Sequence, residues 1–277
     1  MLWFKREPLQ RVDHLEPAEL RVSFDAGILE SKLERLLDAT AERGGIDVFL
    51  DALRGKQTLF TEALRTDVLL QMDAQSFQAV LDTVFPARRR LGDVVSSLSM
   101  DDWRQRTELL LRGKQSLSER LDNFVSVAAA SNKKQQRALW DFAVELVHFN
   151  DPEHYPLMTR WIWDAKTQSG SLREFIRAND TMQTVDMGVA PEDFEAARLW
   201  IIGQLSEKGF YRDLPLLVDL VKAQAYADYV LAMSSGMGMM GSEFGGRMEP
   251  LDFVVKLLGI EPARNGGRSR LKAATVH

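Results

Sequence analysis

Apolar residues recur with a helical period along almost the whole chain. Between Gly27 and Arg43, for example, positions 28, 29, 33, 36 and 37 are apolar and share one face of a helix that Gly44 would end. The alternation typical of strands is confined to Leu20–Phe24, with Leu2–Phe4 as a possible partner. Two short strands cannot form a stable sheet core alone. The pattern therefore predicts an all-α, irregular multi-helix bundle of about twelve helices with at most a minor N-terminal hairpin.

Helix start signals locate several of these elements. Ser99-Met-Asp-Asp102 and Ser116-Leu-Ser-Glu119 are capping boxes, and Asp73 is a candidate N-cap. Prolines in a first helical turn predict helix starts at Asp151-Pro-Glu153 and at Pro191-Glu-Asp193. Other helices are predicted over Ile46–Leu53, Thr58–Leu70, Ala74–Phe85, Ala87–Leu98, Asn132–Phe149, Leu214–Met233 and Leu251–Leu258.

One seven-residue sequence occurs twice with a single conservative change. Leu53-Arg-Gly-Lys-Gln-Thr-Leu59 recurs 58 residues later as Leu111-Arg-Gly-Lys-Gln-Ser-Leu117. Both copies are predicted to lie between helices, with glycine as the C-cap and Thr or Ser as the next N-cap. A duplicated helix pair and two independent uses of the same loop chemistry both explain the repeat.

The polar segment 179–189 is the best candidate for a linker. It divides the chain into an N-terminal helical region, residues 1–178, and a C-terminal helical region, residues 190–261. Residues 262–277 are predicted to be a disordered basic tail. A single domain with a long loop at 179–189 explains the sequence equally well.

Composition excludes several classes of protein. The 277 residues are 45% hydrophobic and 27% charged, contain no cysteine and carry a net charge of −5, which is typical of a globular protein. Disulfides, cysteine-ligated metal sites and cysteine nucleophiles are excluded. No apolar run has the roughly 18–20 residues of a membrane helix, and no secretory signal begins the chain, so a cytoplasmic protein is expected. The acidic body disfavours a broad nucleic-acid surface, although the tail carries Arg268 and Arg270.

The common catalytic patterns are missing, and no cofactor is predicted. The sequence has four histidines, no Gly-x-Ser-x-Gly and no P-loop. The Gly-x-Gly-x-x-Gly match at Gly236–Gly241 follows a predicted helix rather than a strand, which rejects a dinucleotide site. A metal-dependent enzyme remains an alternative. Its candidate ligands are Glu145, His148, Asp151 and His154.

Two regions could form a surface for a ligand or a protein partner. One is rich in aromatic residues, whose rings can stack on planar groups but more often fill a helical core. The other combines glycine with methionine, which builds adaptable apolar contacts. The candidate residues are Trp140, Tyr155, Arg160, Trp161, Met237, Met239 and Met240.

Residues Leu110–Asp164 resemble a known type of module. Glu119-Arg-Leu-Asp-Asn-Phe124 and Glu145-Leu-Val-His-Phe-Asn-Asp-Pro-Glu-His-Tyr-Pro-Leu157 look like a helical module of bacterial proteins that is similar to the helix-hairpin-helix DNA glycosylase superfamily. The glycine-rich hairpin of that superfamily would fall at Ser131–Gln136, which has no glycine, and its catalytic aspartate would align near Met158. The resemblance therefore implies a module without glycosylase chemistry.

These observations predict a cytoplasmic helical binding or accessory protein that acts through contacts with a protein partner and has no catalytic centre of its own. The first alternative is nucleic-acid binding through the degenerate helix-hairpin-helix-like module, and the second is the metal-dependent enzyme. The candidate phosphate contacts for the first alternative are Lys133, Lys134, Arg137, Arg268 and Arg270.

Overall fold

The computed structural model describes residues 15–128, 131–177, 183–236 and 249–261. These ranges form an all-α fold, as the sequence predicts, with eleven α-helices rather than about twelve. Three short 3-10 helices, η1 to η3, lie between them. The α-helices are α1 (Ala26–Ala41), α2 (Ile46–Ala63), α3 (Thr66–Leu69), α4 (Ala74–Asp82), α5 (Gly92–Ser96), α6 (Met100–Arg112), α7 (Leu117–Val125), α8 (Lys133–Asn150), α9 (Pro191–Glu207), α10 (Leu214–Gly236) and α11 (Pro250–Leu257).

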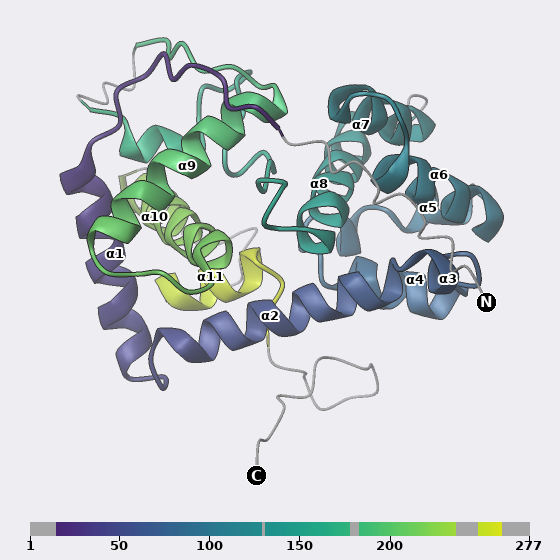
Figure 1. Ribbon diagram of the computed structural model, residues 1–277, viewed down its shortest axis with the longest axis horizontal. Coiled ribbons are helices and arrows are strands. Elements are labelled where there is room, and N and C mark those ends of the chain that lie inside the picture. The colour runs from purple at the N-terminus through teal and green to yellow at the C-terminus, as the bar shows by residue number, and fades with distance from the viewer. Residues whose placement is uncertain (1–14, 129–130, 178–182, 237–248, 262–277) are drawn as a thin grey trace, which may run out of the picture.

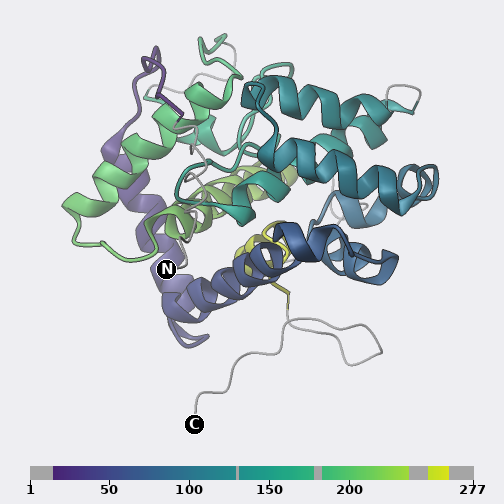
Figure 2. The same cartoon turned by 45° about the vertical axis from the view of Figure 1, so that its right-hand side comes forward.

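Helix α2 runs along one side of the molecule and contacts both groups of helices (Figures 1 and 2). The first group contains α1, α9, α10 and α11, and the second contains α3 to α8 (Figure 1). Helices on both sides of segment 179–189 pack together, since α1 and α2 both contact α10. One cluster of buried apolar residues extends from Phe24 to Ile260, so the two sequence regions share a core.

Four of the predicted helix start signals are present in the structure. Ser99 and Ser116 both form reciprocal capping boxes, with Asp102 and Glu119 respectively. The Asp73 carboxylate accepts a hydrogen bond of 2.8 Å from the backbone N–H of Ser76. Helix α9 begins at the predicted proline. These ends agree with the sequence because a cap satisfies backbone groups within a few residues of itself.

Other local predictions are wrong. Leu20–Phe24 forms no strand, and Phe24 makes only an isolated bridge with Ile176, while Leu2–Phe4 lies outside the described residues. The segment after Asp151 forms turns instead of a helix. The predicted helix Ala87–Leu98 is divided into η1 (Ala87–Arg89) and α5.

The two copies of the repeated heptad adopt different structures. The second ends α6 at Gly113 and starts α7, as predicted. The first lies inside α2, which continues through Gly55. Glycine inside a helix costs about 1 kcal/mol relative to alanine. The burial of Leu53 and Phe60 on the same helix outweighs that cost, because full burial of one such side chain is worth roughly 1.5–3 kcal/mol.

Replacing Gly259 with alanine is expected to lower the free energy of unfolding by about 2–5 kcal/mol. Gly259 has φ +68°, and an added Cβ would collide with the carbonyl oxygen of Thr83. Gly209→Ala is the matched control, since Gly209 has φ +89° but open space around the added carbon. Urea unfolding of both variants measures the difference, and equal losses would contradict the steric argument.

Candidate functional site

Helix α8 places three ionisable residues on one buried face. Asp141, Glu145 and His148 follow the i, i+4, i+7 spacing, which aligns side chains along a helix. They are 2%, 2% and 0% exposed. Charged groups are almost never fully buried without partners, because leaving water costs several kcal/mol per ion. Each of the three meets a partner from a different part of the fold.

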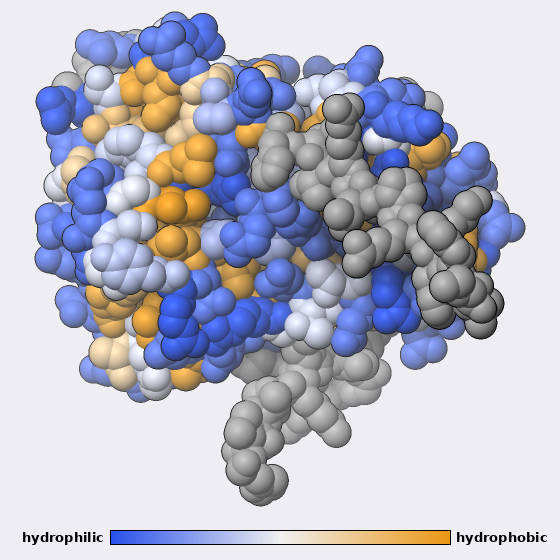
Figure 3. Space-filling model, in the orientation of Figure 1, coloured by the Kyte–Doolittle hydropathy of each residue, from blue (hydrophilic) through white to orange (hydrophobic). Residues whose placement is uncertain are grey.

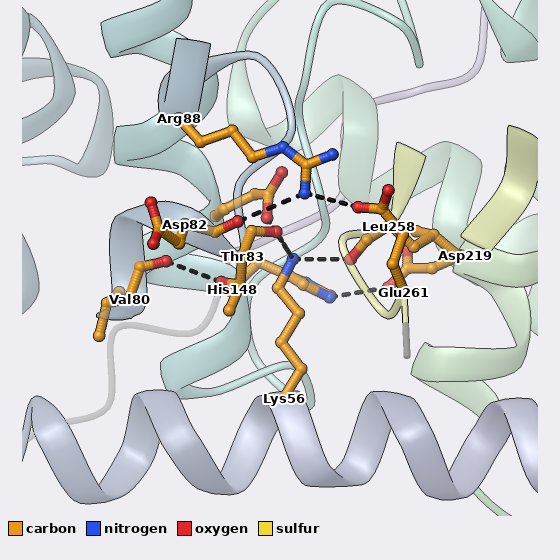
Figure 4. Close-up of polar contacts among 10 residues, drawn as sticks. Lys56, Val80, Asp82, Thr83, Arg88, His148, Asp219, Leu258 and Glu261 are labelled. Atoms are coloured by element: carbon orange, nitrogen blue, oxygen red, sulfur yellow. Dashed lines mark hydrogen bonds and ion pairs between the residues drawn. The ribbon is translucent and has the colours of Figure 1, made fainter. Parts of the chain in front are cut away.

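Glu145 faces Lys56 of α2 in the centre of the molecule. The Lys56 ammonium lies 2.6 Å from Glu145 Oε2 and donates to the carbonyl oxygens of Leu258, at 2.8 Å, and Thr83, at 3.1 Å. Figure 4 shows Lys56 projecting from α2 towards the carbonyl oxygens of Thr83 and Leu258. Its three donors are therefore all used, and it also lies 4.2 Å from the centre of the Phe149 ring.

Burial dominates the titration of this pair. It lowers the pKa of Lys56, against the opposing effect of Glu145. It raises the pKa of Glu145 to about 6, against the opposing effect of Lys56. No lining residue of a described pocket belongs to the pair. The pair therefore joins α2, α8 and the residue that follows α11.

His148 links α8 to α10 through Asp219. Its Nδ1 lies 2.8 Å from the carbonyl oxygen of Tyr155, which can only accept, so Nδ1 carries a proton. Its Nε2 lies 2.7 Å from Asp219 Oδ2 (Figure 4). Burial by itself raises the pKa of Asp219, but His148 and the nearby cation Lys222 together lower it.

Asp141 faces Arg160, which lies in the loop after α8. Asp141 Oδ1 accepts from the backbone N–H of Arg160 at 3.0 Å, and its Oδ2 lies 3.6 Å from Arg160 Nη2. Arg160 Nη1 is 3.4 Å from Asp164 Oδ2. Burial raises the pKa of Asp141 to about 6, although Arg160 opposes the shift. The carboxylates thus contact one side of the guanidinium, and the Arg160 side chain remains 34% exposed.

The exposed side of Arg160 borders a basic pocket of about 210 Å³. The pocket lies between the turn that carries η1 and the first two turns of α8. Four of its lining residues are cations and none is acidic. Arg89, Arg90 and Lys134 make no ion pair with any residue that the structure describes. The lining residues are Phe85, Pro86, Arg89, Arg90, Lys134, Ala138 and Arg160.

The four candidate metal ligands do not converge. Glu145 contacts Lys56, and His148 contacts Asp219. His154 pairs with Asp151 at 2.9 Å in a half-buried position. Within the described ranges, no group of three or more acidic or histidine residues could hold a metal ion. The geometry therefore offers no support for the metal-dependent alternative.

The aromatic candidates belong mainly to the core. Trp161 is 6% exposed and packs against Tyr226 with ring centres 6.0 Å apart. Trp140 and Tyr155 are half-buried, and Trp140 donates to the carbonyl oxygen of Met158 at 3.3 Å. Of this group only Arg160 lines the pocket. Met237, Met239 and Met240 lie outside the described residues.

Of the five candidate phosphate contacts predicted from the sequence, only Lys134 lines the pocket. Lys133 is exposed beside it in sequence, and Arg137 is half-buried. Arg268 and Arg270 lie outside the described residues. Arg89 and Arg90 are not among the candidates predicted from the sequence. Three consecutive arginines after Pro86 were the available signal, but they are 44 residues from Lys134 along the chain.

No known family model, curated protein or solved structure matches the chain. The geometry alone therefore carries the functional argument. Met158, the position that the sequence resemblance aligns with a catalytic aspartate, is buried in the core. None of the described helices is long and apolar enough to cross a membrane.

Proposed function

We propose that this protein is a helical binding protein that holds an anionic, phosphate-bearing ligand in the basic pocket and needs no catalytic centre of its own. The single observation that carries the proposal is the convergence of Arg89, Arg90, Lys134 and Arg160 on one pocket without an acidic lining residue. We expect this binding protein to be cytoplasmic, as its sequence predicts.

Electrostatics favour an anion at this position. Like charges brought together raise the free energy of the empty protein, and a bound anion relieves that repulsion. Arginine forks match the geometry of phosphate oxygens, and lysine adds a point charge. Lys134 lies in the first turn of α8, where the helix dipole also favours negative charge.

The surface gives less support to the other expected partners. A nucleic-acid backbone requires a tract of cations, whereas these cations converge on one small pocket. Figure 3 shows apolar side chains gathered over the part of this face where α9 and α10 lie. Leu199 of α9 and Tyr211, which lies between α9 and α10, are exposed. Because apolar atoms form more than half of an ordinary protein surface, this exposure does not by itself identify a protein partner.

The double variant Arg89→Gln/Arg90→Gln is expected to abolish stabilisation by inorganic phosphate. A ligand at 100 times its Kd stabilises the folded state by about 2.7 kcal/mol, which raises the Tm of the wild type by several degrees. Thermal melts in phosphate and in chloride at equal ionic strength measure this effect. Both arginines are exposed, so the substitutions should leave the fold intact.

The matched control is Lys114→Gln/Arg212→Gln, which removes two exposed cations that do not line the pocket. It should retain the full phosphate effect. Phosphate stabilisation that persists in the pocket variant, or its absence from the wild type, would refute the proposed function.

A further inference from the structure

The charged residues close to the pocket favour phosphate-bearing ligands of a matching negative charge. Four cations line it, but Arg160 also faces the carboxylates of Asp141 and Asp164. The four lining cations and these two acids together carry a formal charge of about +2, and Lys256 and the paired Arg88 and Glu261 lie next to the lining residue Phe85. A phosphate monoester carries about −1.5 to −2 at pH 7. A diester carries a single negative charge and would leave part of the cationic charge unmatched.

Arg160 is only partly committed to its acidic neighbours. Its Nη atoms lie 3.4 and 3.6 Å from Asp164 and Asp141, farther than the roughly 2.7–2.9 Å of a strong charge-assisted hydrogen bond. Its Nε–H is buried and has no hydrogen-bond partner among the described residues. The guanidinium can therefore donate to an anion without first breaking short ion-pair bonds.

The dimensions of the pocket agree with a small charged group. Its volume of about 210 Å³ is below the roughly 300–1,000 Å³ typical of pockets for drug-sized ligands. Phe85, Pro86 and Ala138 form its apolar part, which offers space for a single organic substituent on the phosphate.

We infer that the ligand is a phosphate monoester whose terminal dianionic phosphate contacts Arg89, Arg90, Lys134 and Arg160, with Asp141 and Asp164 competing for Arg160. This inference rests on the proposed function and narrows its ligand class. Other ionisable groups near Asp141 are Glu145 on α8 and Tyr226 on α10. Neither lines the pocket, so neither contacts the phosphate directly.

Methyl phosphate and dimethyl phosphate test the inference because they differ by one methyl group and one ionisable oxygen. Titration calorimetry or NMR titration of the full chain at pH 7.5 should show at least tenfold tighter binding of methyl phosphate. Lys134→Gln and Arg160→Gln should both reduce this preference, whereas Arg212→Gln should retain it. Lys134 is exposed, so its variant gives a result even if the Arg160 variant is unstable.

The affinity of the Asp141→Asn variant for methyl phosphate tests the inference independently of the comparison between the two esters. Removing the competing carboxylate should strengthen the binding of methyl phosphate several-fold, whereas a purely structural Asp141 would give no gain. Equal affinity for the two esters, lost in Arg89→Gln/Arg90→Gln, would overturn the monoester inference while retaining the anion-binding function. If neither ester binds, both the monoester inference and the proposed function are overturned.

Discussion

Lys56→Met is expected to lower the free energy of unfolding by about 3–5 kcal/mol, because it leaves a buried charge without its partner. Glu145 would remain beneath the surface without its ammonium group, and the carbonyl oxygens of Thr83 and Leu258 would lose their Lys56 donor. Methionine keeps a similar length and apolar stem, so the loss measures charge and hydrogen bonding more than volume. Urea unfolding at pH 7.5 gives the value.

Lys114→Met is the matched control, because the sequence provides the same lysine in a second copy of the heptad. Lys114 is exposed, and its replacement should change stability by no more than about 0.5 kcal/mol. Lys56→Met/Glu145→Leu should recover much of the loss, since replacing both members of a buried pair with apolar groups is often neutral. A Lys56 variant as stable as the Lys114 variant would show that the buried pair contributes nothing.

His148→Leu is the second substitution with a large expected effect, again about 3–5 kcal/mol at pH 7.5. It leaves Asp219 without the imidazole that lies 2.7 Å away, and it removes the donor to the carbonyl oxygen of Tyr155. His154→Leu is the control. His154 pairs with Asp151 in a half-buried position, where such a pair is worth about 1 kcal/mol or less.

The loss in His148→Leu should also depend on pH. In the wild type the pKa of Asp219 is lowered, so its contribution is present above the ordinary value of 3.8 and is lost as pH falls through the lowered value. Without His148, burial should raise that pKa, and ionisation of Asp219 should then destabilise the fold as pH rises. The stability difference should therefore widen between pH 5 and pH 7.5. A constant difference would contradict the inference that His148 keeps the pKa of Asp219 low in the native state.

Two further acids set the background of that measurement. Burial raises the pKa values of Asp141 and Glu145 to about 6, from ordinary values of 3.8 and 4.5. The folded state therefore binds more protons than the unfolded state between about pH 4 and pH 6, and these groups lower stability as pH rises through that range. The His148→Leu and His154→Leu variants both retain Asp141 and Glu145. Most of the pH dependence that these two acids cause therefore cancels when the stability of each variant is compared with that of the wild type.

The pocket could be predicted only in part. Lys134 and Arg160 were candidates for separate functions, one as a phosphate contact and the other as part of an aromatic surface. The structure places them with Arg89 and Arg90 around one space. Segments so far apart in sequence meet through the packing of α8 against η1 and the loop after α8, and no local pattern encodes that contact.

The sequence by itself determined the all-α class, the caps at Ser99 and Ser116 and the absence of cysteine chemistry. These features depend on helical periodicity, on hydrogen bonds within a few residues and on which side chains are present. Only the tertiary structure decided between two nearly identical heptads. Lys114 remains in a solvated turn, whereas Lys56 enters the core, because Glu145, Thr83 and Leu258 supply its partners from distant parts of the chain. Burial of a charge depends on partners that long-range packing brings together, and the seven residues around the lysine do not specify them.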